Sequence, residues 1–379
     1  MFAGTLHHLF FSELLVTHFL MFLAGLVALV AGADLLVRGA SRLALSFGIS
    51  PLVVGLTIVA FGTSAPEMAV SAGAVLNGQT GLAMGNVVGS NIFNVLFILG
   101  LSALIIPLVV HVQLIRQEVP IMIGASLLVL VLALDGTLGL FDGALLFGLL
   151  LAYTGFLVVQ SRRASREAQA EFDAEIQPAS PDAWDARLPV QLALIAAGLA
   201  LLVLGSDWLV SAAVFFAQSL GVSDLVIGLT IVAAGTSMPE VATSIMAALK
   251  GERDIAVGNV VGSSTFNLLG CLGLSGVLAG LLPGSPGLTV APSLLALDIW
   301  VMLAVALACL PIFLSGREIA RWEGAVFLGY YVAYMAYVVL AAQQHAVLGP
   351  FSAVMMGFVV PITVVTLVVS LLRRPAPTT

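Results

Sequence analysis

Charge is scarce in this chain. Asp, Glu, Lys and Arg make up 9% of its 379 residues, whereas 60% of the residues are hydrophobic. A soluble domain of this length could not cover so much apolar surface, so the composition excludes a soluble protein and predicts a polytopic membrane protein. The apolar runs lack the alternation of transmembrane barrel strands, which leaves an all-α fold.

Cysteine and histidine are also rare. Both cysteines, Cys271 and Cys309, lie in apolar runs and do not form a disulfide framework. The five histidines are scattered, so no site for zinc or copper is indicated. The chain has no HExxH motif and no Ser/His pairing. These absences predict that the protein is not an enzyme, carries no cofactor, and has the lipid bilayer rather than a nucleic acid as its partner.

About eleven apolar runs have the length of roughly 20 residues that a membrane-spanning helix needs. They cover 16–44, 51–76, 81–107, 117–134, 138–160, 188–218, 224–249, 254–282, 291–314, 319–342 and 347–372. With the N-terminus outside, all 13 Lys and Arg residues fall in the inside connections and the tail, as the positive-inside rule requires. The hydrophilic stretch 161–187 and the C-terminal tail are therefore predicted to be cytoplasmic, in an inner or plasma membrane.

One segment occurs twice. Residues 51–102 and 224–275 align without a gap at a constant offset of 173, and about 32 of the 52 positions are identical. Five spans separate the start of one copy from the start of the next, and because five is odd the copies must be inverted in the membrane, which is typical of secondary transporters. The predicted organisation is a first repeat at 1–160, a linker at 161–187, a second repeat at 188–342, and an additional helix with a basic tail at 343–379.

The motif GTSAPE at 62–67 returns as GTSMPE at 235–240. Gly and Pro so close together interrupt a helix. We expect carbonyls near Ala60 and Ala233 to lose their helical donors and become oxygen ligands. Hydroxyl oxygens from both copies and the two intramembrane carboxylates would complete an oxygen cage of charge −2, which suits calcium or sodium. These side chains are Thr63, Ser64 and Glu67 in the first copy, and Thr236, Ser237 and Glu240 in the second.

A second motif, GNVVGSNIFN at 85–94 and GNVVGSSTFN at 258–267, would close the cage from neighbouring helices. Ser90 and Asn94 lie four residues apart and so share a helical face, and Ser263 and Asn267 repeat this spacing. Hydrogen bonding between helices explains these pairs as well as ion binding does. No basic residue in these spans could neutralise the glutamates, so a purely structural role for them is disfavoured.

The paired motifs resemble the two α-repeats of the sodium/calcium exchanger family, over residues of about 20–340. The resemblance implies ten helices in two inverted halves, with an eleventh outside the pattern, and antiport of calcium against sodium by alternating access, in which the first and sixth helices slide past the rest. It implies calcium ligands at Thr63, Glu67, Thr236 and Glu240. The other implied cation-binding positions are Ala60, Ser64, Ser90 and Asn94 in the first copy, and Ala233, Ser237, Ser263 and Asn267 in the second.

One departure concerns the sodium stoichiometry. Some microbial members carry Asp where this chain has Asn267, so this cage holds two formal negative charges rather than three. Glutamate can bind a proton as well as sodium, so exchange of calcium against protons, or exchange that depends on potassium or moves another cation, remains an alternative. A passive cation channel is a further alternative from a different class, although channels more often build their filters from a ring of subunits.

Overall fold

A computed structural model describes residues 2–172, 185, 187–221, 231 and 233–372. Ten helices among them are long and apolar enough to cross a membrane. They occupy Leu14–Phe47, Pro51–Leu76, Thr80–Ile105, Leu114–Ala133, Leu140–Ser161, Leu188–Ser219, Arg253–Leu281, Leu294–Leu314, Arg321–Ala342 and Leu348–Val369. The predicted span 224–249 lies partly outside the described residues, and its described part is α11 (Ala233–Gly235) and α12 (Met238–Leu249). The predicted all-helical fold with an extra C-terminal helix is confirmed.

Several spans are built from more than one element. The second joins α2 (Pro51–Val54), η1 (Gly55–Val59), α3 (Ala60–Thr63) and α4 (Ala65–Leu76), where η marks a π-helix. The third joins α5 (Thr80–Phe93), η2 (Asn94–Leu99) and α6 (Gly100–Ile105). Its counterpart in the second half joins α13 (Arg253–Phe266), η6 (Asn267–Cys271) and α14 (Leu272–Leu281). The span Leu114–Ala133 joins η3 (Leu114–Glu118) and α7 (Val119–Ala133). The span Leu294–Leu314 joins η7 (Leu294–Asp298) and α15 (Ile299–Leu314).

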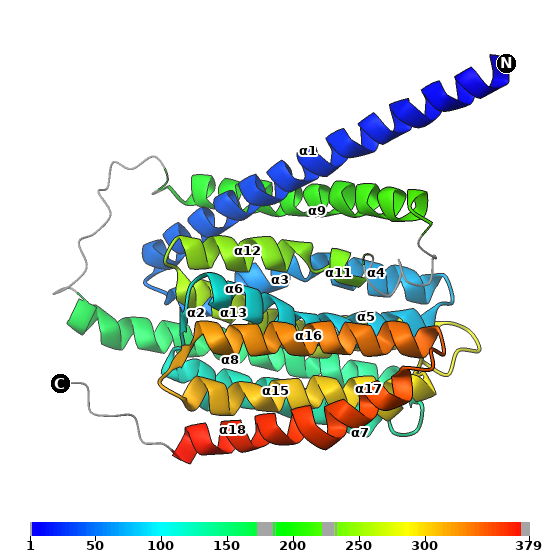
Figure 1. Cartoon of the computed structure of the whole chain (residues 1–379). Helices are drawn as coiled ribbons and strands as arrows, with labels where there is room; N and C mark the ends of the chain where they lie inside the picture. The colour runs from blue at the N-terminus through cyan, green and yellow to red at the C-terminus, as the bar shows by residue number, and fades with distance from the viewer. Residues whose placement is uncertain (1, 173–184, 186, 222–230, 232, 373–379) are drawn as a thin grey trace.

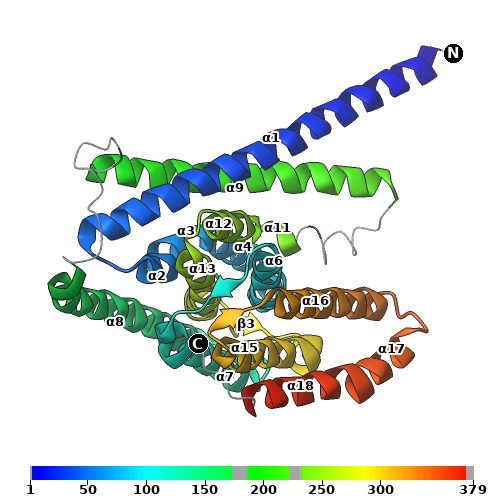
Figure 2. The same ribbon diagram turned by 60° about the vertical axis from the view of Figure 1, so that its left-hand side comes forward.

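Two long helices, α1 (Phe2–Phe47) and α9 (Leu188–Ser219), lie against each other along one side of the molecule (Figures 1 and 2). Glycines let their backbones touch: a Cβ on Gly25 would lie 2.8 Å from the carbonyl oxygen of Gly205, and one on Gly32 would lie 2.8 Å from that of Gly198. The 173-residue offset takes Gly25 to Gly198 and Gly32 to Gly205, so the two contacts are equivalent to each other. The inverted repeat therefore extends into the first helix of each half.

Short strands extend the same symmetry. Strand β1 (Leu108–Val109) pairs antiparallel with β4 (Glu318–Ile319), and β2 (Thr137–Leu138) pairs antiparallel with β3 (Leu288–Thr289). Each pair takes one strand from each half, so the halves are tied together by backbone hydrogen bonds at two places. These strands could not be predicted from the sequence, because two-residue segments carry no periodicity.

Helix α8 (Leu140–Phe172) is longer than the predicted span 138–160 and continues into the stretch expected to be a linker. Of residues 173–186, Asp185 is the one that the structure describes. Its Oδ2 accepts hydrogen bonds from Arg38 Nε at 2.9 Å and Arg42 Nε at 3.2 Å. Burial by itself raises the pKa of Asp185, but the two arginines lower it by more, so its pKa lies below the ordinary range. The charged carboxylate thus ties the linker to α1.

The last two spans complete one side of the bundle. They are α16 (Arg321–Ala342), followed by α17 (Leu348–Val354), η8 (Met355–Val359) and α18 (Val360–Leu372). In Figure 1 the segment from α17 to α18 runs along the edge of the molecule next to α15. The described residues of the final span are hardly buried, so this helix is attached to the two-repeat body through one face only.

Candidate cation-binding site

Each GTS(A/M)PE motif breaks its helix directly before the glutamate. Helix α3 ends at Thr63 and α4 begins at Ala65, while α12 begins at Met238 after a break at Ser237. Glu67 and Glu240 therefore lie in the first turn of a half-helix, where the positive end of the helix dipole favours a carboxylate. Both side chains have no solvent exposure.

The carbonyls freed by the prolines are not the ones that we expected. The Ala60 carbonyl keeps its helical donor, because the backbone N–H of Ser64 bonds to it at 3.0 Å. Pro66 and Pro239 have no N–H, so the carbonyls that lose their helical donors are those four residues earlier, at Gly62 and Gly235. In the second half that carbonyl is bonded by the hydroxyl of Ser206 at 2.6 Å. Ala60 itself therefore keeps its helical donor, and the carbonyls that lose theirs lie two residues later in each motif.

The serine of each GTS(A/M)PE motif donates a hydrogen bond to the glutamate of the other motif. Ser237 Oγ donates to Glu67 Oε1 at 2.9 Å, and Ser64 Oγ donates to Glu240 Oε1 at 3.3 Å. Each glutamate is thus held by the serine of the opposite motif. Because these motifs stand 173 residues apart, the cage forms only when the two inverted halves face each other.

Hydroxyl groups on the neighbouring helices α5 and α13 lie in the same polar cluster. The hydroxyl oxygens of Thr63 and Ser263 lie 3.3 Å apart, and Ser237 Oγ lies 3.3 Å from Ser90 Oγ. Ser263 Oγ also donates to the carbonyl of Ala60 at 3.4 Å. This carbonyl is therefore part of the polar cluster even though its helical bond is intact.

Sequence reasoning missed a second layer of side chains behind the cage. Asn259 Oδ1 accepts from Thr63 Oγ1 at 3.1 Å, and Asn259 Nδ2 donates to Ser244 Oγ at 3.0 Å. Asn86 repeats this arrangement, with Thr236 Oγ1 at 3.4 Å and Ser71 Oγ at 3.0 Å. These residues are identical in both copies and lie in apolar helices, and Asn86 comes four residues before Ser90. That spacing places Asn86 on the same helical face as Ser90 and could have identified it from the sequence.

The π-helices η2 and η6 begin at Asn94 and Asn267, directly after α5 and α13. Such bulges are frequent at functional sites, because they widen the helix and redirect its side chains. The halves differ here: the thiol of Cys271 donates to Asn267 Oδ1 at 3.4 Å, whereas the corresponding residue of the first half is Ile98, which has no donor.

Several polar atoms of this cluster are buried without a hydrogen-bond partner among the described residues. They are Oε2 of Glu67, Oε2 of Glu240, both amide atoms of Asn94, and Nδ2 of Asn267. No Lys, Arg or His in the described part of the chain forms an ion pair with either glutamate. Carboxylate oxygens that are buried and unpaired at this depth are costly, and a bound cation would satisfy them.

A sequence profile of the family described as "Sodium/calcium exchanger protein" matches residues 17–159 and 190–340 of this chain. The chain belongs to the sodium/calcium exchanger family. It is accordingly a membrane transporter of the cation/calcium antiporter type and not an enzyme. The last span, Leu348–Val369, lies beyond the matched residues.

Individual relatives agree with this membership. CaxA of Alkalimonas amylolytica is 41% identical over 317 residues, which cover 82% of this chain and 95% of CaxA. The sodium/calcium exchanger MaX1 of Methanosarcina acetivorans is 34% identical over 351 residues, which cover 85% of this chain and 98% of MaX1. A solved structure of the sodium-calcium exchanger NCX_Mj, soaked with Na⁺ and Ca²⁺, matches with a TM-score of 0.70 at 30% identity, covering 85% of this chain and 98% of that one.

Proposed function

We propose that this chain exchanges Ca²⁺ for Na⁺ across the membrane by alternating access, with both ions bound in turn around Glu67 and Glu240. The observation that carries the proposal is the pair of fully buried carboxylates, each with one oxygen bonded to the opposite half and one oxygen unpaired. Calcium takes six to eight oxygen ligands in flexible geometry, and the crossed hydroxyls, carbonyls and carboxylates supply such a set.

The proposed ligands follow from the cluster. Calcium would be bound by Thr63, Glu67, Thr236 and Glu240, and sodium ions would use these together with Ala60, Ser64, Ser90, Asn94, Ala233, Ser237, Ser263 and Asn267. The ions are the cargo, so no resident cofactor is needed. The N-terminus would lie outside, with the linker and the C-terminal tail in the cytoplasm.

The test is calcium-45 uptake into proteoliposomes that contain sodium. We expect uptake with internal sodium and none with internal choline or potassium. Uptake driven by a proton gradient instead would keep the site and replace the coupling ion. Calcium flux in the absence of any counter-ion would mean a passive channel and would overturn exchange.

Replacing Asn267 by Asp is expected to change the sodium dependence of exchange. The substitution puts a third carboxylate where Cys271 now donates to the amide oxygen. We expect the half-saturating sodium concentration to fall about tenfold, which corresponds to ~1.4 kcal/mol. Sodium titrations of calcium uptake measure this, with the exposed Asn77→Asp as the control. An unchanged sodium affinity and Hill coefficient would argue against a role for Asn267 in binding sodium.

An ion pair at the predicted cytoplasmic end joins α1 to the helix that carries Glu240. Lys250 Nζ lies 2.6 Å from Asp34 Oδ1 and donates to the backbone carbonyl of Asp34 at 3.0 Å. The corresponding positions of the other half are Asn77 and Asp207, which cannot form an ion pair. The pair therefore stabilises closure at one end of the bundle and has no equivalent at the other.

Breaking this pair is expected to alter the calcium exchange rate about two- to fivefold, because a partly exposed ion pair contributes roughly 0.3–1 kcal/mol. Lys250→Met and Asp34→Asn should shift the rate in the same direction, and the double variant should shift it no further. Lys250→Arg serves as the control that keeps the charge. Additive effects of the two single variants would show that the pair does not act as a unit during transport.

A further inference from the structure

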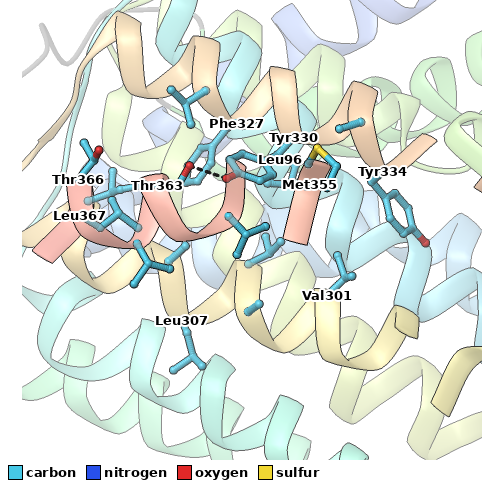
Figure 3. Close-up of a pocket in the computed structure, with 18 of the residues that line it drawn as sticks. Leu96, Val301, Leu307, Phe327, Tyr330, Tyr334, Met355, Thr363, Thr366 and Leu367 are labelled. Carbon is cyan, nitrogen blue, oxygen red and sulfur yellow. Dashed lines mark hydrogen bonds between the residues drawn. The ribbon is translucent and has the colours of Figure 1, made fainter. Parts of the chain in front are cut away.

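A cavity of about 650 Å³ lies between α15, α16 and the last span, and Leu96 of η2 also contributes to its lining. Figure 3 shows its lining, with Val301 and Leu307 on α15, Tyr330 on α16, and Met355 and Leu367 on the last span. Its third wall is the helix that lies beyond the residues matched by the exchanger family. The cavity therefore forms where this chain's additional span meets the two-repeat body.

The polar groups in the middle of the lining are already bonded to the protein. The Tyr330 hydroxyl bonds to Thr363 Oγ1, as the dashed line in Figure 3 marks, and Thr363 Oγ1 donates to the Val359 carbonyl at 2.9 Å. The Tyr334 hydroxyl donates to Asp298 Oδ1 at 2.9 Å. These side chains leave little hydrogen-bonding capacity for a polar ligand, so the occupant must be held by apolar contacts.

The position of the cavity specifies which apolar molecule can reach it. On α16 the lining runs from Trp322 to Tyr337, which is about 22 Å along a helix and most of the ~30 Å hydrocarbon core. Trp and Tyr at the two ends are the residues that favour the membrane–water interfaces. An apolar cavity excludes water, and hydrocarbon chains are the fluid that surrounds the helices at this depth.

We propose that this cavity binds one acyl chain of a membrane phospholipid, which fills the space between the two-repeat body and the last helix. Its volume lies within the usual range of ligand-binding cavities, about 300–1,000 Å³. The hydrogen bond from Tyr330 to Thr363 joins α16 to α18 beside the proposed acyl chain. The lipid thereby acts as part of the packing that attaches the last span. The proposal does not depend on which ions the protein exchanges.

The experiment uses the full chain reconstituted in nanodiscs with a phospholipid that carries a diazirine in its acyl chain. After irradiation, adducts are mapped by peptide mass spectrometry. We expect adducts concentrated on cavity residues of α15, α16 and the last span. Ala308→Phe and Ala333→Phe, which both fill the lining, should each lower these adducts at least about fivefold. Ala325→Phe lies on the exposed side of α16 outside the lining and should leave them unchanged.

The outcomes separate the possible occupants. Adducts spread evenly over all exposed helix faces, and unchanged in the two filling variants, would overturn the proposal. A dimer in native mass spectrometry, with crosslinks between the last spans of two chains and no adducts in the cavity, would assign the surface to a second copy and also overturn it. If both filling variants fail to give monodisperse protein, the adduct map of the unsubstituted chain decides.

Discussion

Calcium exchange is expected to fall at least about a hundredfold when Glu67 or Glu240 is replaced by glutamine, a loss of ~2.7 kcal/mol or more. Glutamine has nearly the same shape and can still accept the hydrogen bond from Ser237 or Ser64, so the fold is retained. What disappears is half of the negative charge that offsets the desolvation of a divalent ion. Sodium-driven calcium-45 uptake into proteoliposomes measures the effect.

The matched control is Glu318→Gln, which removes a carboxylate from an exposed position on β4. It should transport at the rate of the unsubstituted chain. All three variants should reach the membrane in equal amounts and elute as monodisperse protein. Near-normal uptake by the Glu67 or Glu240 variant would remove that residue from the proposed site.

A leucine at Gly198 is expected to abolish the close contact between α1 and α9. A Cβ at this position would lie 2.7 Å from the backbone nitrogen of Leu36 and 2.8 Å from the carbonyl oxygen of Gly32. Backbone atoms cannot move aside as a side-chain end can, so the helices must separate, and overpacking of this kind costs roughly 1–3 kcal/mol. We expect the melting temperature to fall and exchange to drop at least about tenfold.

Gly148→Leu provides the comparison, because a Cβ on this membrane-spanning glycine meets no atom within 4 Å. Its melting temperature and exchange rate should stay close to those of the unsubstituted chain. Melting curves from intrinsic fluorescence and calcium uptake measure both properties. Equal behaviour of the two variants would show that the contact between α1 and α9 tolerates separation.

The polar residues of the candidate site could be found from the sequence because the chain supplies its own comparison. Thr63, Ser64 and Glu67 recur at an offset of 173 inside apolar segments, where a polar residue is costly and is kept for a reason. Asn86 and Asn259 recur at the same offset, but their contacts with Thr236 and Thr63 join the two halves and could not be predicted from the repeat. The internal repeat thus indicates the positions of the candidate ligands in the sequence.

The sequence could not specify which atoms meet. Identity between the copies makes Ser64 and Ser237 equivalent, but it does not reveal that each bonds to the glutamate of the other half. The π-helical turns that begin at Asn94 and Asn267 were also invisible, because the hydrophobic pattern of such a short segment does not differ from that of an α-helix. Both features arise when two inverted halves pack face to face.

Composition and the repeat by themselves determined the membrane class, the inverted plan and the positions of the candidate ligands. These follow from local rules: apolar length, the cost of buried charge, and helix breaking by proline. The tertiary structure decided the crossed hydrogen bonds, the contact between Gly32 and Gly198, and the cavity beside the last span. In membrane spans that are apolar on every side, no face is marked in advance, so the partner of each helix is chosen only by shape when the helices pack.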